Sequence, residues 1–287
     1  MGELLALGSA LVWALTAIAM RPIAGKALLN ASLVRVLVGS AILLAYAWPT
    51  GAIERALAAP ASGWLWLVGS TFSSLVVGDS LYFAASARIG VARALPIASA
   101  FPLFGTAGAV LLRGEPATVP LIVGTILVVV GVGVIVAERP FPTGNRGEHI
   151  DLLGATLACL AALGWASSGL QLDAALDVLD PVAANLIRFP LATAAFAALC
   201  LVRQPAGSLL GAERWLAVAA GVGTVGAAVL FVGAIDATGP ARAIALNATS
   251  PVFGAILAAW LLHEKVTPRG ILGIASCVMG SILLTMP

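Results

Sequence analysis

Asp79 stands out because it is a carboxylate inside a long apolar stretch, next to Ser80 and Tyr82. A charged side chain at the centre of a bilayer costs about 2.5 to 3.5 kcal/mol. Such a carboxylate must face a cavity, pair with a cation or bind a proton. We interpret Asp79 as a site for an ammonium group or a mobile proton, and the alternative is a structural ion pair with Arg35 or Arg88.

Four aromatic side chains form two matching pairs in the two halves of the chain. Trp13 and Trp165 lie in the middle of apolar stretches, away from the ends where membrane tryptophans collect. Tyr82 and Phe231 form the second pair, and Tyr82 adds a hydroxyl group that needs a hydrogen-bond partner. We predict that these rings line one cavity, and helix packing is the alternative.

Three further candidate residues come shortly before two prolines. Ser99 and Phe101 lie within one helical turn of Pro102, and Asn247 stands in the same relation to Pro251. A proline inside a helix frees nearby backbone carbonyl groups, which can line a binding cavity. Hydrogen bonds between helices and simple kinks explain these residues equally well.

The composition identifies the medium that surrounds these residues. Hydrophobic residues make up 61% of the chain and charged residues 10%, with a mean hydropathy of +1.06. A soluble domain carries about 25% charged residues. The net charge of +2 gives no indication of nucleic-acid binding. The three cysteines lack metal-ligand spacing and no cofactor motif is present, so we expect no metal and no cofactor.

Ten apolar stretches are long enough to cross a bilayer, for which a helix needs about 20 residues. They are residues 4–20, 36–53, 56–78, 94–112, 116–137, 152–172, 181–202, 215–235, 243–262 and 270–287. The sequence therefore predicts an all-α integral membrane protein with ten transmembrane helices. An outer-membrane barrel would show short alternating segments instead. The first stretch lacks the basic residues that precede a cleaved signal peptide.

The second half of the chain repeats the first. Under a shift of 149 residues the matching segments are Gly90–Ala94 with Gly239–Ala243 and Pro102–Gly105 with Pro251–Gly254. Each half holds five predicted spans, an odd number, so the second half must cross the membrane in the inverted direction. Inverted repeats around a central cavity are typical of secondary transporters. The predicted parts are a first repeat at 1–138, a linker at 139–151 and a second repeat at 152–287.

The loop charges predict the orientation. Ten of the 15 Lys and Arg residues fall in loops on one side and three on the other. Because cytoplasmic loops are enriched in positive charge, the ten-charge side is predicted to be cytoplasmic and both termini periplasmic. Arg35 and Arg188 fall inside the second and seventh spans. We expect both near the cytoplasmic ends of those spans, with side chains that reach lipid phosphates.

The repeated motifs resemble the EamA-type transporters of the drug/metabolite transporter superfamily. The residues that carry the resemblance are an early tryptophan in each half, Leu81–Ala84, the Ala-Arg-Ala segments, Pro-x-Phe, Leu111–Glu115 and its echo at Leu261–Glu264. The resemblance implies ten helices around a central cavity and the transport of small metabolites. Amino-acid exporters, including exporters of aromatic amino acids, are the most similar group.

The function that follows is secondary or facilitative export of amino acids by alternating access across a bacterial inner membrane. The expected partners are a small-molecule substrate and the lipid bilayer, with the protein as a monomer or weak homodimer. Export of drugs or of nucleotide-sugar-like metabolites is the alternative within the superfamily. An intramembrane enzyme is a third option, but both histidines, His149 and His263, lie outside the spans, and no catalytic motif is present.

Overall fold

In a computed structural model of the protein we describe residues 1–20, 23, 28–89, 94, 97–137, 151–203, 211–261 and 267–286. Within these residues every regular element is a helix. The elements are α1 (Gly2–Met20), α2 (Leu28–Thr50), α3 (Ala52–Leu57), α4 (Ala61–Thr71), the π-helix η2 (Phe72–Gly78), α5 (Asp79–Ile89), α7 (Phe101–Arg113), α8 (Val119–Ala137), α9 (Leu152–Leu176), α10 (Pro181–Arg203), α11 (Ala212–Thr238), α12 (Pro240–Asn247), α13 (Ser250–Leu261) and α14 (Pro268–Leu284).

Within the described residues the chain forms ten helical crossings that run side by side between two faces of the molecule. Seven of the crossings, made by α1, α2, α4 with η2, α8, α9, α10 and α11, are long and apolar enough to span a bilayer by themselves. The other three are made by α7, by α12 followed by α13, and by α14. The predicted all-α membrane fold is confirmed.

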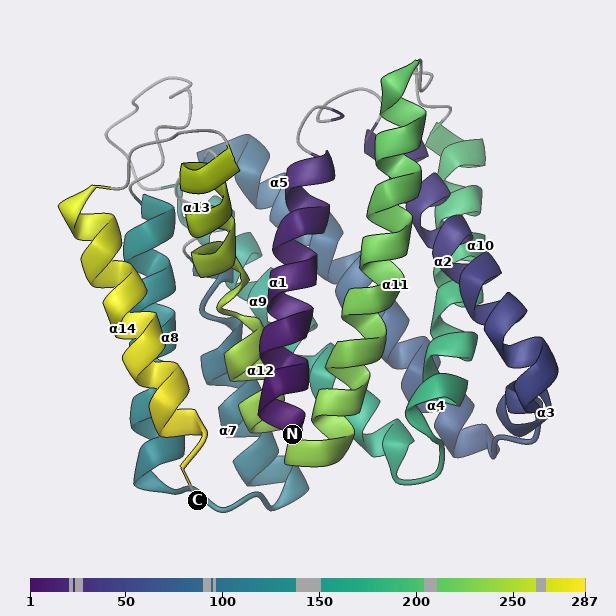
Figure 1. Ribbon diagram of the computed structural model, residues 1–287, viewed down its shortest axis with the longest axis horizontal. Coiled ribbons are helices and arrows are strands. Elements are labelled where there is room, and N and C mark those ends of the chain that lie inside the picture. The colour runs from purple at the N-terminus through teal and green to yellow at the C-terminus, as the bar shows by residue number, and fades with distance from the viewer. Residues whose placement is uncertain are drawn as a thin grey trace.

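The two halves run in opposite directions between these two faces (Figure 1). Helix α1 rises from the N-terminus at the lower edge of the picture, whereas its counterpart α9 descends towards that edge. The C-terminus returns to the same edge. We call this side the terminus face, and its connections are residues 51–60, 114–118, 177–180 and 239.

Three crossings differ from the continuous helices that the sequence predicts. The fourth breaks at residues 99–100, so that α7 begins at Phe101, and the ninth breaks at residues 248–249, before α13. Pro102 and Pro251 each occupy the second position of the new helix, where a missing N–H group costs nothing. In the third crossing the π-helix η2 lies between α4 and α5.

The helices are packed largely through small residues. Alanines that are fully buried occur in α1, α9, α11 and α12, including Ala6, Ala162, Ala220 and Ala245. In a bilayer the hydrophobic effect does not drive helices together, so small residues that let backbones approach closely become the main packing device. This close packing brings α1 against α11, and α9 lies among α4, η2, α5 and α7.

Candidate functional site

Three of the predicted site residues meet around Trp165, where the two halves join. The Trp165 ring lies 5.5 Å from the Tyr82 ring, centroid to centroid, with a tilt of 47° between the planes. Phe101 approaches the same indole edge-on at 6.2 Å and 89°. Both are favourable geometries for aromatic pairs. The cluster therefore joins α9 of the second half to α5 and α7 of the first.

Two glycines allow this cluster to form. A Cβ atom at Gly78 would lie 2.8 Å from Cδ1 of Trp165, and one at Gly164 would lie 2.7 Å from the carbonyl oxygen of Ser73. Both distances are too short for a real side chain, so the backbones of η2 and α9 touch at this depth. Because π-helical turns are frequent at functional sites, the position of η2 beside Trp165 supports a functional role for this region.

Hydroxyl and amide groups strengthen the same contact between the halves. The hydroxyl groups of Ser70 and Ser168 lie 2.8 Å apart, and the Ser168 hydroxyl donates to the Ser70 carbonyl at 2.9 Å. The Gln171 amide donates to the Ser73 hydroxyl at 2.9 Å. Interhelical bonds of this kind contribute on average about 0.6 kcal/mol each in membrane proteins.

Trp13 has different neighbours from Trp165, although the two residues match in the repeat. The guanidinium carbon of Arg35 lies 5.6 Å from the centroid of the Trp13 ring, within the range of a cation–π interaction. The Trp13 side chain is 39% exposed although it lies in the middle of α1. Trp13 therefore carries a cation on its face, whereas Trp165 is packed among other aromatic rings.

The remaining predicted residues are placed in several ways. Asp79 begins α5, but its side chain lies outside the described part of the structure. Ser99 is buried at the break before α7. Phe231 packs against the main apolar core. Asn247, the last residue of α12, donates from Nδ2 to the hydroxyl of Ser9 at 2.8 Å and so links α12 to α1.

The pseudo-twofold axis passes between α2 and α10, at the hydroxyl groups of Ser40 and Thr193, which lie 2.9 Å apart. Arg35 and Arg188 each lie five residues before this contact on their own helix. Because α2 and α10 run in opposite directions, the two arginines lie on opposite sides of the membrane centre. The expectation that both lie near the cytoplasmic side was wrong for this reason.

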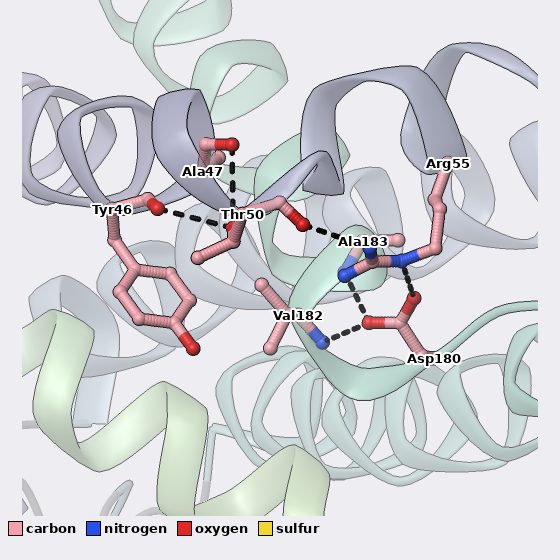
Figure 2. Close-up of polar contacts among 7 residues, drawn as sticks. All are labelled: Tyr46, Ala47, Thr50, Arg55, Asp180, Val182 and Ala183. Carbon is pink, nitrogen blue, oxygen red and sulfur yellow. Dashed lines mark hydrogen bonds and ion pairs between the residues drawn. The ribbon is translucent and has the colours of Figure 1, made fainter.

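On the terminus face, ion pairs connect the two halves. Figure 2 shows Arg55 of α3, whose Nε donates to the Asp180 carboxylate at 3.1 Å and whose Nη1 donates to the Thr50 carbonyl. The other carboxylate oxygen of Asp180 accepts the backbone N–H groups of Val182 and Ala183 at the start of α10. Burial raises the pKa of Asp180, but these N–H groups and Arg55 outweigh burial and hold it below its ordinary value.

A second group of contacts lies beside the first pair. Arg113, at the end of α7, pairs with Asp173 on α9 and with Asp177 at 2.7 Å. Glu115 accepts the backbone N–H of Ala241 in the first turn of α12, and burial raises the pKa of Glu115. Gly239, at a φ of +79°, makes room for this carboxylate. Two arginines and one glutamate of the first half therefore hold the second half at this face.

On the opposite face, the described ion pair between the halves joins Arg88 on α5 to Asp151, at 2.8 Å. Asp151 also caps the start of α9 by accepting the N–H of Gly154. The guanidinium group of Arg88, with this N–H, lowers the pKa of Asp151.

Sequence reasoning missed these ion pairs. A signal was present: Asp173 and Asp177 are spaced by one helical turn, near a side of the membrane that holds only three basic residues. It did not indicate which of those basic residues would meet the acids, because the pairing depends on how the two halves pack.

The arrangement defines a class of protein: an α-helical membrane protein of two inverted halves, with aromatic and polar side chains where the halves meet. The EamA-like transporter family matches residues 1–137 and 152–286 of the chain. An uncharacterized transporter from Archaeoglobus fulgidus is 30% identical over 228 residues, which are 77% of this chain and 76% of that protein.

A solved crystal structure of a protein with 23% sequence identity shares the fold. Its TM-score is 0.82, and the match covers 99% of this chain and 96% of the other. The chain therefore belongs to the EamA-like transporter family, within the drug/metabolite transporter superfamily, and is a multi-pass membrane transporter.

Proposed function

We propose that the protein exports amino acids, with a preference for aromatic or other hydrophobic ones, as a secondary or facilitative transporter. The observation that carries the proposal is the position of Trp165, which belongs to the second half but packs against Tyr82 and Phe101 of the first. A substrate ring that binds here would contact both halves at once. Movement between the halves would then depend on the substrate, as a transporter requires.

We further propose that transport proceeds by alternating access, with the ion pairs of the terminus face closing one entrance. Arg55 with Asp180, and Arg113 with Asp173 and Asp177, join residues of different halves. Opening this face would require these pairs to separate. Partly exposed pairs contribute little net stability, about 0 to 1 kcal/mol each, so separating them costs little free energy.

Counterflow of radiolabelled amino acids into proteoliposomes tests the proposed substrate. Phenylalanine or tryptophan inside the vesicles should drive uptake of the labelled compound, and Trp165→Ala should reduce this uptake about threefold to tenfold through lost ring contacts. Trp215→Ala is the matched control, because Trp215 is 70% exposed at the start of α11 and should leave uptake unchanged. The absence of counterflow for every amino acid would exclude the proposal.

The orientation is a separate proposal: we place the terminus face in the periplasm of a bacterial inner membrane, because it holds three of the 15 basic residues. In a variant without its native cysteines, Ser62→Cys at the start of α4 should react with a membrane-impermeant thiol reagent in intact cells. Reaction only after lysis would reverse the orientation.

A further inference from the structure

Arg188 points into the protein although it lies deep in a membrane-spanning helix. It is the eighth residue of α10, about 10 Å from the start of that helix at 1.5 Å per residue. The residues one turn away on the same face, Ala184, Asn185 and Ala192, are 0%, 0% and 3% exposed. This face of α10 is therefore covered by other helices rather than by lipid, and Arg188 does not reach lipid phosphates.

Arg188 nevertheless lacks a partner within the described residues. Its Nε is buried without a hydrogen-bond acceptor, and no ion pair to its guanidinium group is found in the described part of the chain. The residue as a whole is partly exposed, whereas its Nε is buried. Its counterpart Arg35 differs, because it lies over the Trp13 ring.

The same turn of α10 carries a second polar atom without a partner. Asn185 donates from Nδ2 to the Pro181 carbonyl at 3.0 Å, but its Oδ1 is buried and accepts no hydrogen bond from the described residues. Asn185 is neutral, so it cannot balance the charge of Arg188. The Nε of Arg188 thus needs an acceptor and the Oδ1 of Asn185 needs a donor, and the charge without a partner among the described residues of this stretch is the positive charge of Arg188.

We infer that Arg188 binds the carboxylate of the transported molecule. A cation inside a membrane protein is costly and is retained where it meets an opposite charge. The planar guanidinium group matches a carboxylate with two parallel hydrogen bonds, better than a lysine would. This inference rests on the proposed amino-acid transport and deepens it: the substrate carries a carboxylate, and that carboxylate, rather than the ammonium group, is required.

Three probes with the same phenyl ring separate the two charges. Phenylalanine carries both the carboxylate and the ammonium group, phenylpropionate carries only the carboxylate, and phenethylamine carries only the ammonium group. In counterflow, the wild-type protein should carry the first two and discriminate against the third. Arg188→Gln should lower kcat/KM for phenylalanine and phenylpropionate about thirtyfold or more, the usual effect of removing one member of a buried charge pair. Arg203→Gln, at the exposed end of α10, is the control and should leave both rates unchanged.

The melting temperature of the purified protein distinguishes a binding role from a structural one. If Arg188 stays unpaired until the substrate binds, Arg188→Gln should melt at the wild-type temperature or above, because an unpaired buried charge is removed. Phenylpropionate should raise the melting temperature of the wild type and not that of the variant. A variant that loses stability and transport together would identify a structural arginine and overturn the inference.

A carboxylate built into the protein gives an independent test. Asn185→Asp places an acid one turn from Arg188, where it should pair with the guanidinium group, raise the melting temperature and abolish phenylpropionate transport by competition. Unchanged transport in this variant, or in Arg188→Gln, would overturn the inference while amino-acid transport by the wild type stood. Transport of phenylpropionate without phenylalanine would reject amino acids as substrates and leave the carboxylate site in place.

Discussion

Two helix pairs lie on the pseudo-twofold axis, and they are built in different ways. At one end of the molecule α8 and α14 touch through glycines: a Cβ at Gly273 would lie 2.8 Å from the carbonyl oxygen of Gly131, and one at Gly280 would lie 2.6 Å from that of Gly124. At the other end α2 and α10 meet through larger and polar groups. There Phe189 fills the space above Gly39, and Ser40 contacts Thr193.

The difference indicates a division of roles between two pairs that share the same symmetry. Close backbone contact gives α8 and α14 strong dispersion and few alternative arrangements, which suits a pair that holds the halves together. The α2/α10 pair instead carries the intramembrane charges Arg35 and Arg188, which are costly and therefore mark function. Substitutions in the first pair should affect stability, and substitutions in the second should affect transport.

The largest effect is expected for Gly131→Leu in α8. Its nearest neighbours are the Sγ and backbone N of Cys277 and the backbone carbonyl of Gly273, so the new side chain meets two backbone atoms that cannot move aside. Overpacking of this kind costs 1 to 3 kcal/mol or more, so we expect about 3 kcal/mol and little folded protein. Gly133→Leu, two residues away with open space around it, should melt near the wild-type temperature. Equal melting temperatures for the two variants would contradict the claim that contact between α8 and α14 holds the two halves together.

Next in size is the loss of the cation over Trp13. Arg35→Gln should lower kcat/KM in counterflow, and it should also lower the free energy of unfolding by about 1 to 2 kcal/mol, the contribution of a partly desolvated cation–π contact. Arg35→Gln should have no further effect in a Trp13→Leu background, where the contact is already absent. Additive effects of the two substitutions would show that the ring and the cation act separately.

How much of this could be read from the sequence depends on the strength of each signal. The spans and their inversion follow from hydropathy and from an odd number of spans per half, because the bilayer imposes both. The breaks before α7 and α13 were indicated by Pro102 and Pro251, but the sequence did not show that the helices would stop rather than bend.

The site was harder to predict, because it depends on packing between distant segments. Trp13 and Trp165 look equivalent in sequence, yet one meets a cation and the other meets Tyr82 and Phe101. The π-helix η2 contains no residue that marks it. Arg188 was visible in the sequence as an intramembrane charge. That it faces other helices rather than lipid became clear only from the burial of its neighbours along α10.

A smaller effect is expected at the symmetry axis itself. Ser40→Ala and Thr193→Val each remove one side of the 2.9 Å contact between their hydroxyl groups. One hydroxyl donates to the other, and the accepting one donates to a carbonyl of its own helix, Val36 for Ser40 or Phe189 for Thr193, so little is left unsatisfied when one of them is removed. A double-mutant cycle on the free energy of unfolding should give a coupling of about 0.6 kcal/mol. A coupling of zero would mean that the two helices meet only through apolar contacts.

Another small effect is the pH dependence of the terminus face. Because the folded-state pKa of Asp180 lies below its ordinary value, its pair with Arg55 stabilises the protein above the ordinary pKa and is lost as the pH falls through the lowered one. Both side chains are substantially exposed, so the contribution is at most about 1 kcal/mol. Asp180→Asn should therefore lower the melting temperature slightly at pH 7 and make no difference once the pH is below the lowered pKa of Asp180. A difference that persists in acid would contradict this account of the pair.

The central claim, that transport requires the two halves to part at the terminus face, is tested most directly by locking that face. Helices α3 and α10 are in contact there, so cysteines in place of Arg55 and Asp180, in a protein without its native cysteines, can be joined by a short bifunctional reagent that reducing agents cleave. Counterflow should stop when the link is complete and return when it is cleaved. Undiminished counterflow through fully linked protein would show that the substrate passes without separation of these halves.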